Sequence, residues 1–454
     1  MTEYSTYPAY KSSNIKWLGD VPVHWEVWKV THGFNIIGSG TTPKSDSSIF
    51  YDGDIPWVTT SELRETVITD TAQKVTREAV DSHSALKIYS KGSLAIAMYG
   101  ATIGRLGILG VDATFNQACC VFSKPTVFST RFVYYWLWMR RPILISLSNG
   151  GGQPNLSQDD LKKIWIPIPK VEEQQVITKF LDFKTKKIDA LISKQTIFLK
   201  KIIERRCALI SHAVTKGLEP SVPMRDSGIV WLGKIPKHWE TKRLRFCITT
   251  NPSKSEIKLA GEELVSFVPM ESVGEYGGLS LSVEKELGEV GSGYTYFAEN
   301  DVVVAKITPC FENGKGAIAR GLKNGVAFGT TELHVLRAGE MILPDYLFHL
   351  TMSHSFRCFG ESEMYGAGGQ KRVPETFLKD FRIGLPPLSE QQDLVDYINK
   401  VNQQIDLQMR KTADMISRLT EYRSTLITNA VTGKIDVRNF SIPENCESQR
   451  TECA

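Results

Sequence analysis

Two polar loops in this sequence of 454 residues carry side chains that could contact a nucleic acid. The first follows an apolar run and contains Tyr99, Thr102 and Arg105, and the second extends from Lys306 to Lys315. Arginine, lysine, asparagine, glutamine and threonine are the side chains that read base edges or bind phosphates. An ordinary polar turn has a similar composition, so the loops alone leave both interpretations open.

A glycine-rich segment follows each loop further along the chain, at residues 150–156 and 366–373. Gln153 and Gln370 occupy the same place in the two segments, at an offset of 217 residues (370 − 153). Together the loops and segments supply most of the candidate contact residues. The full set is Lys44, Tyr99, Thr102, Arg105, Gln153, Asn155, Lys306, Thr308, Asn313, Lys315, Gln370, Lys371 and Arg372.

Catalytic signatures are missing from the sequence. It has no HExxH, GxSxG, GxGxxG or phosphate-loop motif, and its eight cysteines show no CxxC spacing. His24 and His238 recur beside Trp25 and Trp239, either as a paired site or as packing or capping residues, and we favour the packing interpretation. We therefore predict a chain that is no enzyme and holds no metal or cofactor of its own.

Two repeated phrases show that the framework around these loops is used twice. Trp-Leu-Gly-x-(Val/Ile)-Pro-x-His-Trp-Glu begins at Trp17 and again at Trp231, an offset of 214 (231 − 17). Glu-Gln-Gln begins at Glu173 and again at Glu390, an offset of 217 (390 − 173). The constant offset over the segments that follow indicates one structural unit present in two copies.

The second repeated segment predicts a long helix, at Val171 to Gly217 and at Leu388 to Gly433. Apolar residues alternate steps of three and four, so each helix has a heptad seam, and the two seams are expected to pack on each other. At 1.5 Å per residue each helix is roughly 65 Å long. Lys184 and Arg205 put charge on the first seam, which leaves its packing open. The predicted seam residues are Leu181, Ile188, Leu191, Gln195, Phe198, Ile202 and Leu209, and Ile398, Val401, Ile405, Thr412, Met415, Leu419, Tyr422 and Leu426.

The block before each helix contains short apolar runs between Gly, Asp and Ser, which predicts a β-rich domain. The expected fold class is α+β, with two β-rich domains joined by two long helices. The predicted boundaries are residues 1–19 for an N-terminal segment, 20–165 and 234–382 for the two β-rich domains, 166–217 and 383–437 for the helix regions, 218–233 for a linker, and 438–454 for a disordered tail.

The charge is nearly balanced, at +4 overall. Residues 20–165 hold 14 basic and 13 acidic side chains, and residues 234–380 hold 17 and 19. A free-standing DNA-binding protein usually shows a basic face, so either the charge is patchy or a partner supplies most phosphate contacts. The N-terminus has no signal-peptide core, no run is long enough to span a membrane, and the cysteines are typical of reduced thiols. We expect a cytoplasmic protein.

Taken together, these motifs resemble the specificity subunits of Type I restriction–modification systems. Also similar are the runs Gly53-Asp54-Ile55-Pro56-Trp57-Val58, Tyr99-Gly100-Ala101-Thr102-Ile103-Gly104 and Phe328-Gly329-Thr330-Thr331-Glu332.

The resemblance implies two β-rich target-recognition domains held apart by two long antiparallel coiled-coil helices, and double-stranded DNA as a partner, read as a bipartite asymmetric site. It also implies two methyltransferase subunits and two restriction–translocase subunits, with S-adenosylmethionine, ATP and Mg bound on those partners. A structural coiled-coil hub that binds proteins only, and an enzyme of unrecognised type, are the alternatives. Sequence-selective DNA binding that needs an added methyltransferase would distinguish the first interpretation from both.

Overall fold

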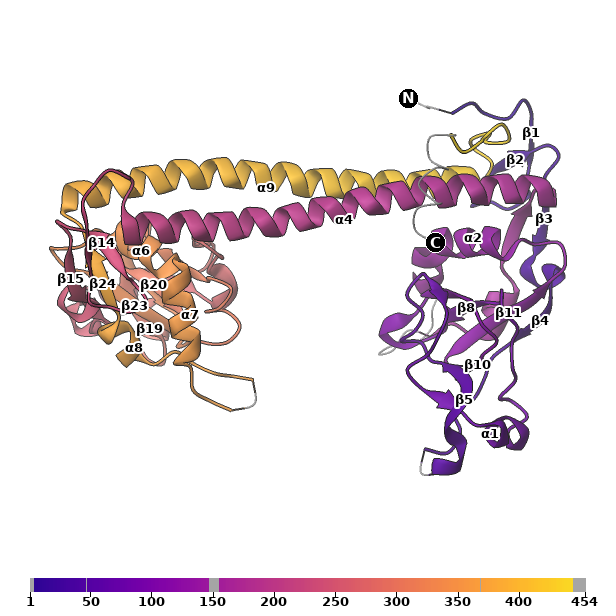
Figure 1. The fold of residues 1–454 in the computed structure, drawn as a ribbon, viewed down its shortest axis with the longest axis horizontal. Coiled ribbons are helices and arrows are strands. Elements are labelled where there is room, and N and C mark those ends of the chain that lie inside the picture. The colour runs from indigo at the N-terminus through magenta and orange to yellow at the C-terminus, as the bar shows by residue number, and fades with distance from the viewer. Residues whose placement is uncertain (1–3, 46, 147–154, 368, 444–454) are drawn as a thin grey trace. The chain divides into compact units, whose positions relative to one another are not determined.

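The computed structural model of the chain describes residues 4–45, 47–146, 155–367 and 369–443. The chain forms two compact units (Figure 1). Unit 1 comprises Met1–Lys194 and Met415–Ala454, and unit 2 comprises Gln195–Asp414. The division passes through both long helices, so each unit contains part of α4 (Val171–Lys216) and part of α9 (Leu388–Val431).

Unit 1 is built on a five-stranded sheet with the order β4-β11-β8-β9-β6 and a three-stranded sheet with the order β10-β5-β7. Its other two sheets pair β1 with β2 and β12 with β3. Its strands are β1 Tyr10–Ser12, β2 Asp20–Pro22, β3 Glu26–Lys29, β4 Phe34–Gly38, β5 Tyr51–Val58, β6 Val67–Ile68, β7 Lys74–Val75, β8 Leu94–Ala97, β9 Leu106–Leu109, β10 Thr114–Phe115, β11 Cys119–Pro125 and β12 Trp165–Ile168. Its shorter helices are α1 Arg77–Ser82, α2 Thr130–Ser146 and α3 Gln158–Lys162.

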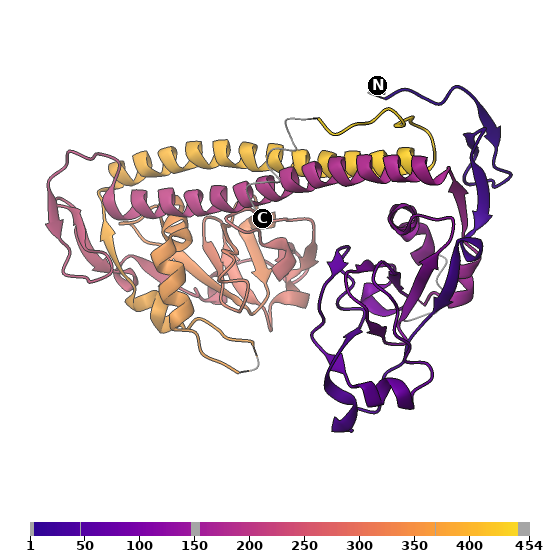
Figure 2. The same ribbon diagram turned by 45° about the vertical axis from the view of Figure 1, so that its right-hand side comes forward.

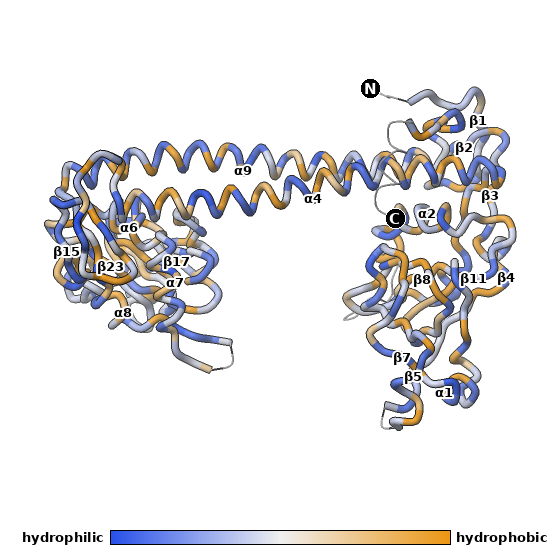
Figure 3. Tube along the Cα trace, in the orientation of Figure 1, coloured by the Kyte–Doolittle hydropathy of each residue, from blue (hydrophilic) through white to orange (hydrophobic). Residues whose placement is uncertain are grey.

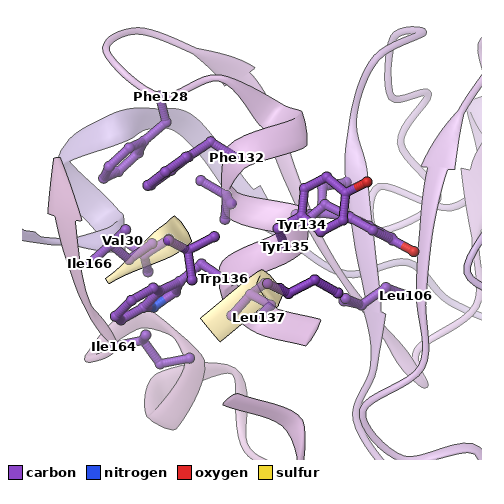
Figure 4. Packing of buried hydrophobic residues seen from close by; sticks show 14 of the residues in the cluster. Val30, Leu106, Phe128, Phe132, Tyr134, Tyr135, Trp136, Leu137, Ile164 and Ile166 are labelled. Carbon is purple, nitrogen blue, oxygen red and sulfur yellow. The ribbon is translucent and has the colours of Figure 1, made fainter. Parts of the chain in front are cut away.

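Helix α2 forms the centre of the largest core in unit 1. Its consecutive residues Phe132 to Leu137 are all buried, as expected for a helix that is apolar on every side. Trp136 points toward Val30 and Ile166, while Tyr134 and Leu137 lie near Leu106 of β9 (Figure 4). The helix therefore joins the five-stranded sheet to the strand that leads into α4.

Unit 2 repeats this plan with different residues. Its first four-stranded sheet has the order β16-β23-β20-β21, which matches β4-β11-β8-β9 in unit 1. Its second has the order β18-β17-β22-β19, and β17 and β22 are parallel, as β5 and β10 are in unit 1. The strands are β13 Met224–Asp226, β14 Lys234–Pro236, β15 Glu240–Arg243, β16 Ile248–Thr250, β17 Leu264–Val268, β18 Glu284–Glu286, β19 Thr295–Ala298, β20 Val302–Ala305, β21 Gly316–Ile318, β22 Val326–Gly329, β23 Leu333–Ala338 and β24 Arg382–Leu385. The shorter helices are α5 Leu287–Val290, α6 Pro344–Met352, α7 His354–Ser362 and α8 Glu375–Asp380.

The two repeated phrases meet at the start of each long helix. In unit 1, Trp25 Nε1 donates to Glu173 Oε1 at 3.0 Å and His24 Nε2 lies 2.8 Å from Glu173 Oε2. In unit 2, Trp239 Nε1 and His238 Nε2 make the same contacts with Glu390, at 3.0 and 2.7 Å. These contacts agree with the packing interpretation of the histidines, because each His-Trp pair is fixed to the carboxylate in the first turn of a helix.

The long helices end as predicted, with Gly217 and Gly433 in the left-handed region at φ of +76° and +72°. Apolar positions recur along both helices, and α4 and α9 lie alongside each other within each unit (Figures 2 and 3). Asp189 pairs with Arg423 at 2.8 Å in unit 1, and Arg206 pairs with Asp406 in unit 2. Since the partner number falls as the α4 number rises, the helices are antiparallel in both units.

Four predicted seam residues are wrong, because Leu191, Phe198, Met415 and Tyr422 are exposed, while the others are buried or half-buried. Leu181, Ile188 and Ile202 of α4 are buried, whereas Leu191 and Phe198 are each 47% exposed. In α9, Met415 is 50% exposed and Tyr422 42%. The residue after each exposed one lies in the packed face instead, namely Ile192 and Leu199 in α4 and Ile416 and Arg423 in α9. Thr185 and Arg206 continue this face in α4, and Asn402 and Met409 continue it in α9. Several of these positions have apolar neighbours, so the pattern alone could not choose between adjacent residues.

The first residues of the predicted tail pack against other residues of unit 1. Arg438 pairs with Asp436 at 2.6 Å, and the Phe440 ring lies 5.1 Å from the ring of Phe180 on α4. The apolar Phe440 finds cover on the helix, so residues 438–443 differ from the detached tail that was expected. The rest of the predicted disordered tail, residues 444–454, lies outside the described residues.

Candidate functional site

The two polar loops occupy equivalent places in the two units. One joins β8 to β9 and includes the short 3-10 helix Gly100–Thr102, and the other joins β20 to β21. The amide of Ala97 donates to the Arg105 carbonyl at 2.9 Å, and the amide of Ala305 donates to the Lys315 carbonyl at 3.0 Å. Arg105 and Lys315 therefore lie at matching backbone positions.

The glycine-rich segments lie against these loops. Tyr99 forms an antiparallel bridge with Asn155, and Ile307 forms one with Arg372. In each unit the next residue of the segment donates its amide to the backbone just before the loop. Leu156 donates to the Met98 carbonyl at 2.7 Å, and Val373 donates to the Lys306 carbonyl at 2.8 Å. Asn155 and Arg372, 217 residues apart (372 − 155), are thus equivalent positions. Gln153 lies outside the described residues, and Gln370 is exposed.

In unit 2 five predicted residues gather where β20 ends. Thr308 Oγ1 accepts from the Lys371 amide and donates to the Lys371 carbonyl, both at 3.1 Å. Lys306 and Arg372 flank this contact, and Gln370 precedes it. The loop between α7 and α8 that carries Gln370 to Arg372 projects from unit 2 on the side away from the long helices (Figure 1). We refer to this cluster of predicted contact residues as the recognition edge of unit 2.

Asn313 and Lys315 lie further along the β20–β21 loop. Asn313 is exposed, while the Lys315 ammonium donates to the Met270 carbonyl at 3.0 Å. Lys315 is therefore partly engaged within the unit, whereas Lys371 is exposed.

Glu332, which was not among the predicted site residues, holds Arg372 at this edge. Arg372 Nε donates to Glu332 Oε2 at 2.9 Å, and Arg372 Nη2 donates to Glu332 Oε1 at 2.7 Å. The hydrogen bonds from Arg372 lower the pKa of Glu332, and the carboxylate raises the pKa of Arg372. Both side chains are therefore charged at neutral pH. The sequence signal was the acidic end of the Phe328–Glu332 motif.

The recognition edge of unit 1 consists of Tyr99, Thr102, Arg105 and Asn155. Tyr99, Thr102 and Arg105 are half-buried and Asn155 is exposed. Lys44 lies elsewhere, next to Pro43, whose carbonyl accepts from Tyr51 of β5 at 2.8 Å. Contacts among the described residues therefore place Lys44 beside the β10-β5-β7 sheet and not beside the β8–β9 loop.

A polar pocket of about 370 Å³ borders the recognition edge of unit 2. Lys306 lines it together with residues that the sequence analysis missed, because they come from separate strands and loops. Burial lowers the pKa of His334, whose Nε2 lies 2.9 Å from the Val373 carbonyl. The other lining residues are Asn251, Pro252, Lys254, Tyr294, Thr295, Tyr296, Leu333 and Glu375.

The described residues form neither a metal-binding group of acidic, histidine and cysteine side chains nor a membrane-spanning helix. Within residues 4–443, apart from the undescribed positions, no three His, Cys, Asp or Glu side chains are grouped so as to hold a metal ion. Of the helices that the structure describes, none combines the length and the apolar character needed to cross a membrane.

Comparisons with known proteins match both halves of the chain. The family described as the Type I restriction modification DNA specificity domain matches residues 22–200 and 236–415. The EcoEI specificity subunit of a Type I restriction enzyme from Escherichia coli is 36% identical over 238 residues, which cover 51% of this chain and 39% of that protein. The MjaVIII specificity subunit of Methanocaldococcus jannaschii is 24% identical over 462 residues, which cover 95% of this chain and 98% of that protein.

A solved chain has a similar fold. It comes from work on complex assembly and conformational transition of the type I R-M system, and its TM-score is 0.67 at 14% identity, with 90% of this chain and 98% of that chain covered. At this identity the likeness supports the α+β architecture with its repeated units, and nothing finer.

Proposed function

Because the chain belongs to the family of Type I restriction modification DNA specificity proteins, we propose that it reads a split, asymmetric DNA sequence and performs no chemistry itself. One observation carries the proposal. The two recognition edges share a backbone arrangement but differ in their side chains. Arg105 and Asn155 in unit 1 correspond to Lys315 and Arg372 at the equivalent positions of unit 2. A repeated framework with different side chains suits two different half-sites, since base edges are distinguished by the side chains that meet them.

Partner subunits complete the proposed complex. Leu191 and Phe198 on α4 and Met415 on α9 are apolar and about half exposed, and such residues along one element favour a protein interface. We place two methyltransferase and two restriction–translocase subunits around this chain, with S-adenosylmethionine, ATP and Mg bound by them. Partners that supply phosphate contacts also account for recognition domains with nearly balanced charge.

The test is the set of methylated sites in cells that carry the chain with its methyltransferase. Arg105→Ala is expected to relax one half-site and Lys315→Ala the other, each at a cost of roughly 1–3 kcal/mol if the side chain reads a base. If either residue contacts phosphate instead, binding should weaken equally for all sequences.

Lys11→Ala on β1 and Lys234→Ala on β14 are matched controls, because both lysines are exposed on two-stranded sheets outside the recognition edges. Neither control should alter the methylated sequence. A wild-type complex that binds methyltransferase but shows no DNA sequence preference would instead support the protein-only hub.

A further inference from the structure

The Arg372–Glu332 pair leaves one side of the arginine available. A guanidinium has five N–H donors in a planar fork. Glu332 takes Nε at 2.9 Å and Nη2 at 2.7 Å, so it occupies the side of the fork formed by Nε and Nη2. Among the described residues, both donors of Nη1 and the second donor of Nη2 have no partner, and together they form the end of the fork. The Arg372 side chain is 39% exposed.

The free end of the fork suits one base better than the others. Guanine presents two acceptors, O6 and N7, in the major groove, and the two parallel donors of an arginine match them. Adenine offers N7 beside an amino donor, which would face an arginine donor. A guanidinium that is already oriented also loses less side-chain entropy on binding.

The surroundings of Arg372 hold it in place. The Glu332 amide donates to Thr330 Oγ1 at 3.2 Å, and the Glu332 carbonyl accepts from the Lys306 amide at 2.9 Å. The carboxylate that orients Arg372 is therefore fixed at the start of β23. Lys306 and Lys371 lie beside the Arg372–Glu332 pair and add positive charge. This charge offsets the negative charge of Glu332, which would otherwise repel DNA phosphates.

The equivalent place in unit 1 has a different pair. Met98 donates its amide to Ala118 at 2.8 Å, as Lys306 does to Glu332, so Ala118 stands where Glu332 stands. Asn155 stands where Arg372 stands, and it is exposed. A carboxamide has one donor and one acceptor side by side, which match N7 and N6 of adenine. A short asparagine needs no carboxylate to orient it.

We propose that Arg372, oriented by Glu332, reads a guanine in the half-site of unit 2, and that Asn155 reads an adenine in the half-site of unit 1. The inference deepens the proposed function and rests on it. It assigns a base class to one backbone position that occurs twice, with the side chain at that position setting the base.

The experiment uses the full chain assembled with its methyltransferase. The wild-type complex first defines the methylated sequence, and its binding is then measured against duplexes in which each position in turn carries each of the four base pairs. Absence of any sequence preference in wild type would refute the proposed function at this stage. With a preference established, Arg372→Ala is expected to lose about 5- to 150-fold in affinity at one G·C position of one half-site, and Asn155→Ala a similar factor at one A·T position of the other.

Two further variants separate base reading from folding. Glu332→Gln keeps the size of the side chain but weakens the hold on Arg372, so it should reduce discrimination at the same G·C position. Arg320→Ala is the control, because Arg320 leaves a comparable carboxylate, Asp345 at 2.6 Å, and lies beyond the opposite end of β21 from the loop. It should leave discrimination unchanged.

The proposal is overturned if Arg372→Ala weakens all duplexes equally, which indicates a phosphate contact, or if it leaves affinity unchanged at an unaltered melting temperature. A loss of discrimination at an A·T position in the unit 2 half-site would also contradict it. If Arg372→Ala fails to fold, Arg372→Gln and Glu332→Gln give the same readout.

Discussion

At the residue scale, hydrogen bonds explain why short phrases repeat in the sequence. Gln174 donates to the carbonyls of Pro169 and Val127 and accepts from the Ser129 amide at 2.7 Å. Gln391 does the same for Pro386, Met341 and the Leu343 amide in unit 2. A buried carboxamide with three partners is costly to replace, because each substitution would leave buried backbone groups unpaired. The Glu-Gln-Gln motif therefore fixes the first turn of each long helix to the domain before it.

A buried histidine in unit 2 predicts a pH dependence. His349 of α6 is 3% exposed, and its Nε2 lies 3.1 Å from Asn399 Oδ1 of α9. Its Nδ1 has no hydrogen-bond partner among the described residues. Burial lowers the pKa of His349 from 6.5 to about 4. The unfolded chain binds a proton at His349 more readily than the folded chain does. The contribution of His349 to the free energy of unfolding is therefore complete above pH 6.5 and is lost as the pH falls toward 4. The loss is about 2 kcal/mol at pH 5.

His349→Gln is expected to remove this contribution, because glutamine does not titrate. The melting temperature should fall less between pH 7 and pH 5 for the variant than for the wild type. His212→Gln is the control, because His212 is exposed on α4. Identical pH profiles for wild type and His349→Gln would show that His349 does not carry the effect.

At the element scale, the long helices have a packed face and an exposed apolar face. The packed face includes Ile188 and Ile202, and the ion pair of Arg206 with Asp406 sets its register in unit 2. That register puts Thr412 opposite residue 200 (206 + 406 − 412), about five residues or 7–8 Å from Gln195 along the axis. The repeat offset (412 − 195 = 217) predicts that Gln195 and Thr412 share a polar layer near the helix centre, and this register contradicts that prediction. Thr412 instead donates to the Gln408 carbonyl of its own helix at 2.8 Å.

The two faces should respond differently to substitution. The double variant Leu191→Gln, Phe198→Gln changes only exposed side chains, so the free energy of unfolding should change by no more than about 1 kcal/mol. Ile202→Ala removes a buried side chain and should cost about 2–5 kcal/mol. Chemical denaturation measures both. The seam described here would be wrong if the double variant proved the more damaging of the two.

The exposed face also makes a functional prediction at this scale. If partner subunits cover it, the double variant should weaken methyltransferase binding while keeping the wild-type melting temperature. Calorimetric titration of methyltransferase into each variant measures this. Lys186→Gln, an exposed change on the same helix, is the control. Unchanged affinity would place the partner elsewhere.

At the scale of the whole molecule, both units contain the same contacts of the long helices, with the two copies of the helix interchanged. Asp189 pairs with Arg423 in unit 1, and their equivalents Asp406 and Arg206 pair in unit 2 (189 + 217 and 423 − 217). Ile427, Ala430 and Val431 pack in the core of unit 1, and their equivalents in unit 2 have the same residue types, Ile210, Ala213 and Val214. The end of either long helix can therefore make the contacts that unit 1 needs.

A fragment of residues 1–220 is accordingly expected to form a dimer. Without α9, the fragment leaves Ile177, Leu181 and Ile188 uncovered, and a second copy can cover them with its own Ile210, Ala213 and Val214. An isologous contact of this kind closes on itself. Sedimentation should show the dimer, and with methyltransferase present it should modify an inverted repeat of the unit 1 half-site.

Asp189→Arg is the informative variant of this fragment. In a dimer it would face Arg206 of the second copy at two places, so association should weaken, and adding Arg206→Asp should restore it. A monomeric wild-type fragment, or a dimer that modifies only the original asymmetric site, would contradict the architecture of two equivalent modules.

The sequence by itself determined the repeat, the α+β class, both long helices with their glycine ends, and the presence of a polar loop after an apolar run in each copy. These follow from local pattern and from offsets that need no spatial information. Helix α6 extends from Pro344 to Met352, because proline at its first turn and an apolar run define it locally.

Only the tertiary structure decided which neighbour of an apolar pair packs against the other helix, as at exposed Leu191 and half-buried Ile192, because both have nearly the same hydrophobicity and packing alone selects between them. The Glu332–Arg372 pair also required the fold, since a contact across 40 residues (372 − 332) leaves no periodic trace in the sequence. Local propensity sets elements, whereas the choice of partners depends on how distant segments pack.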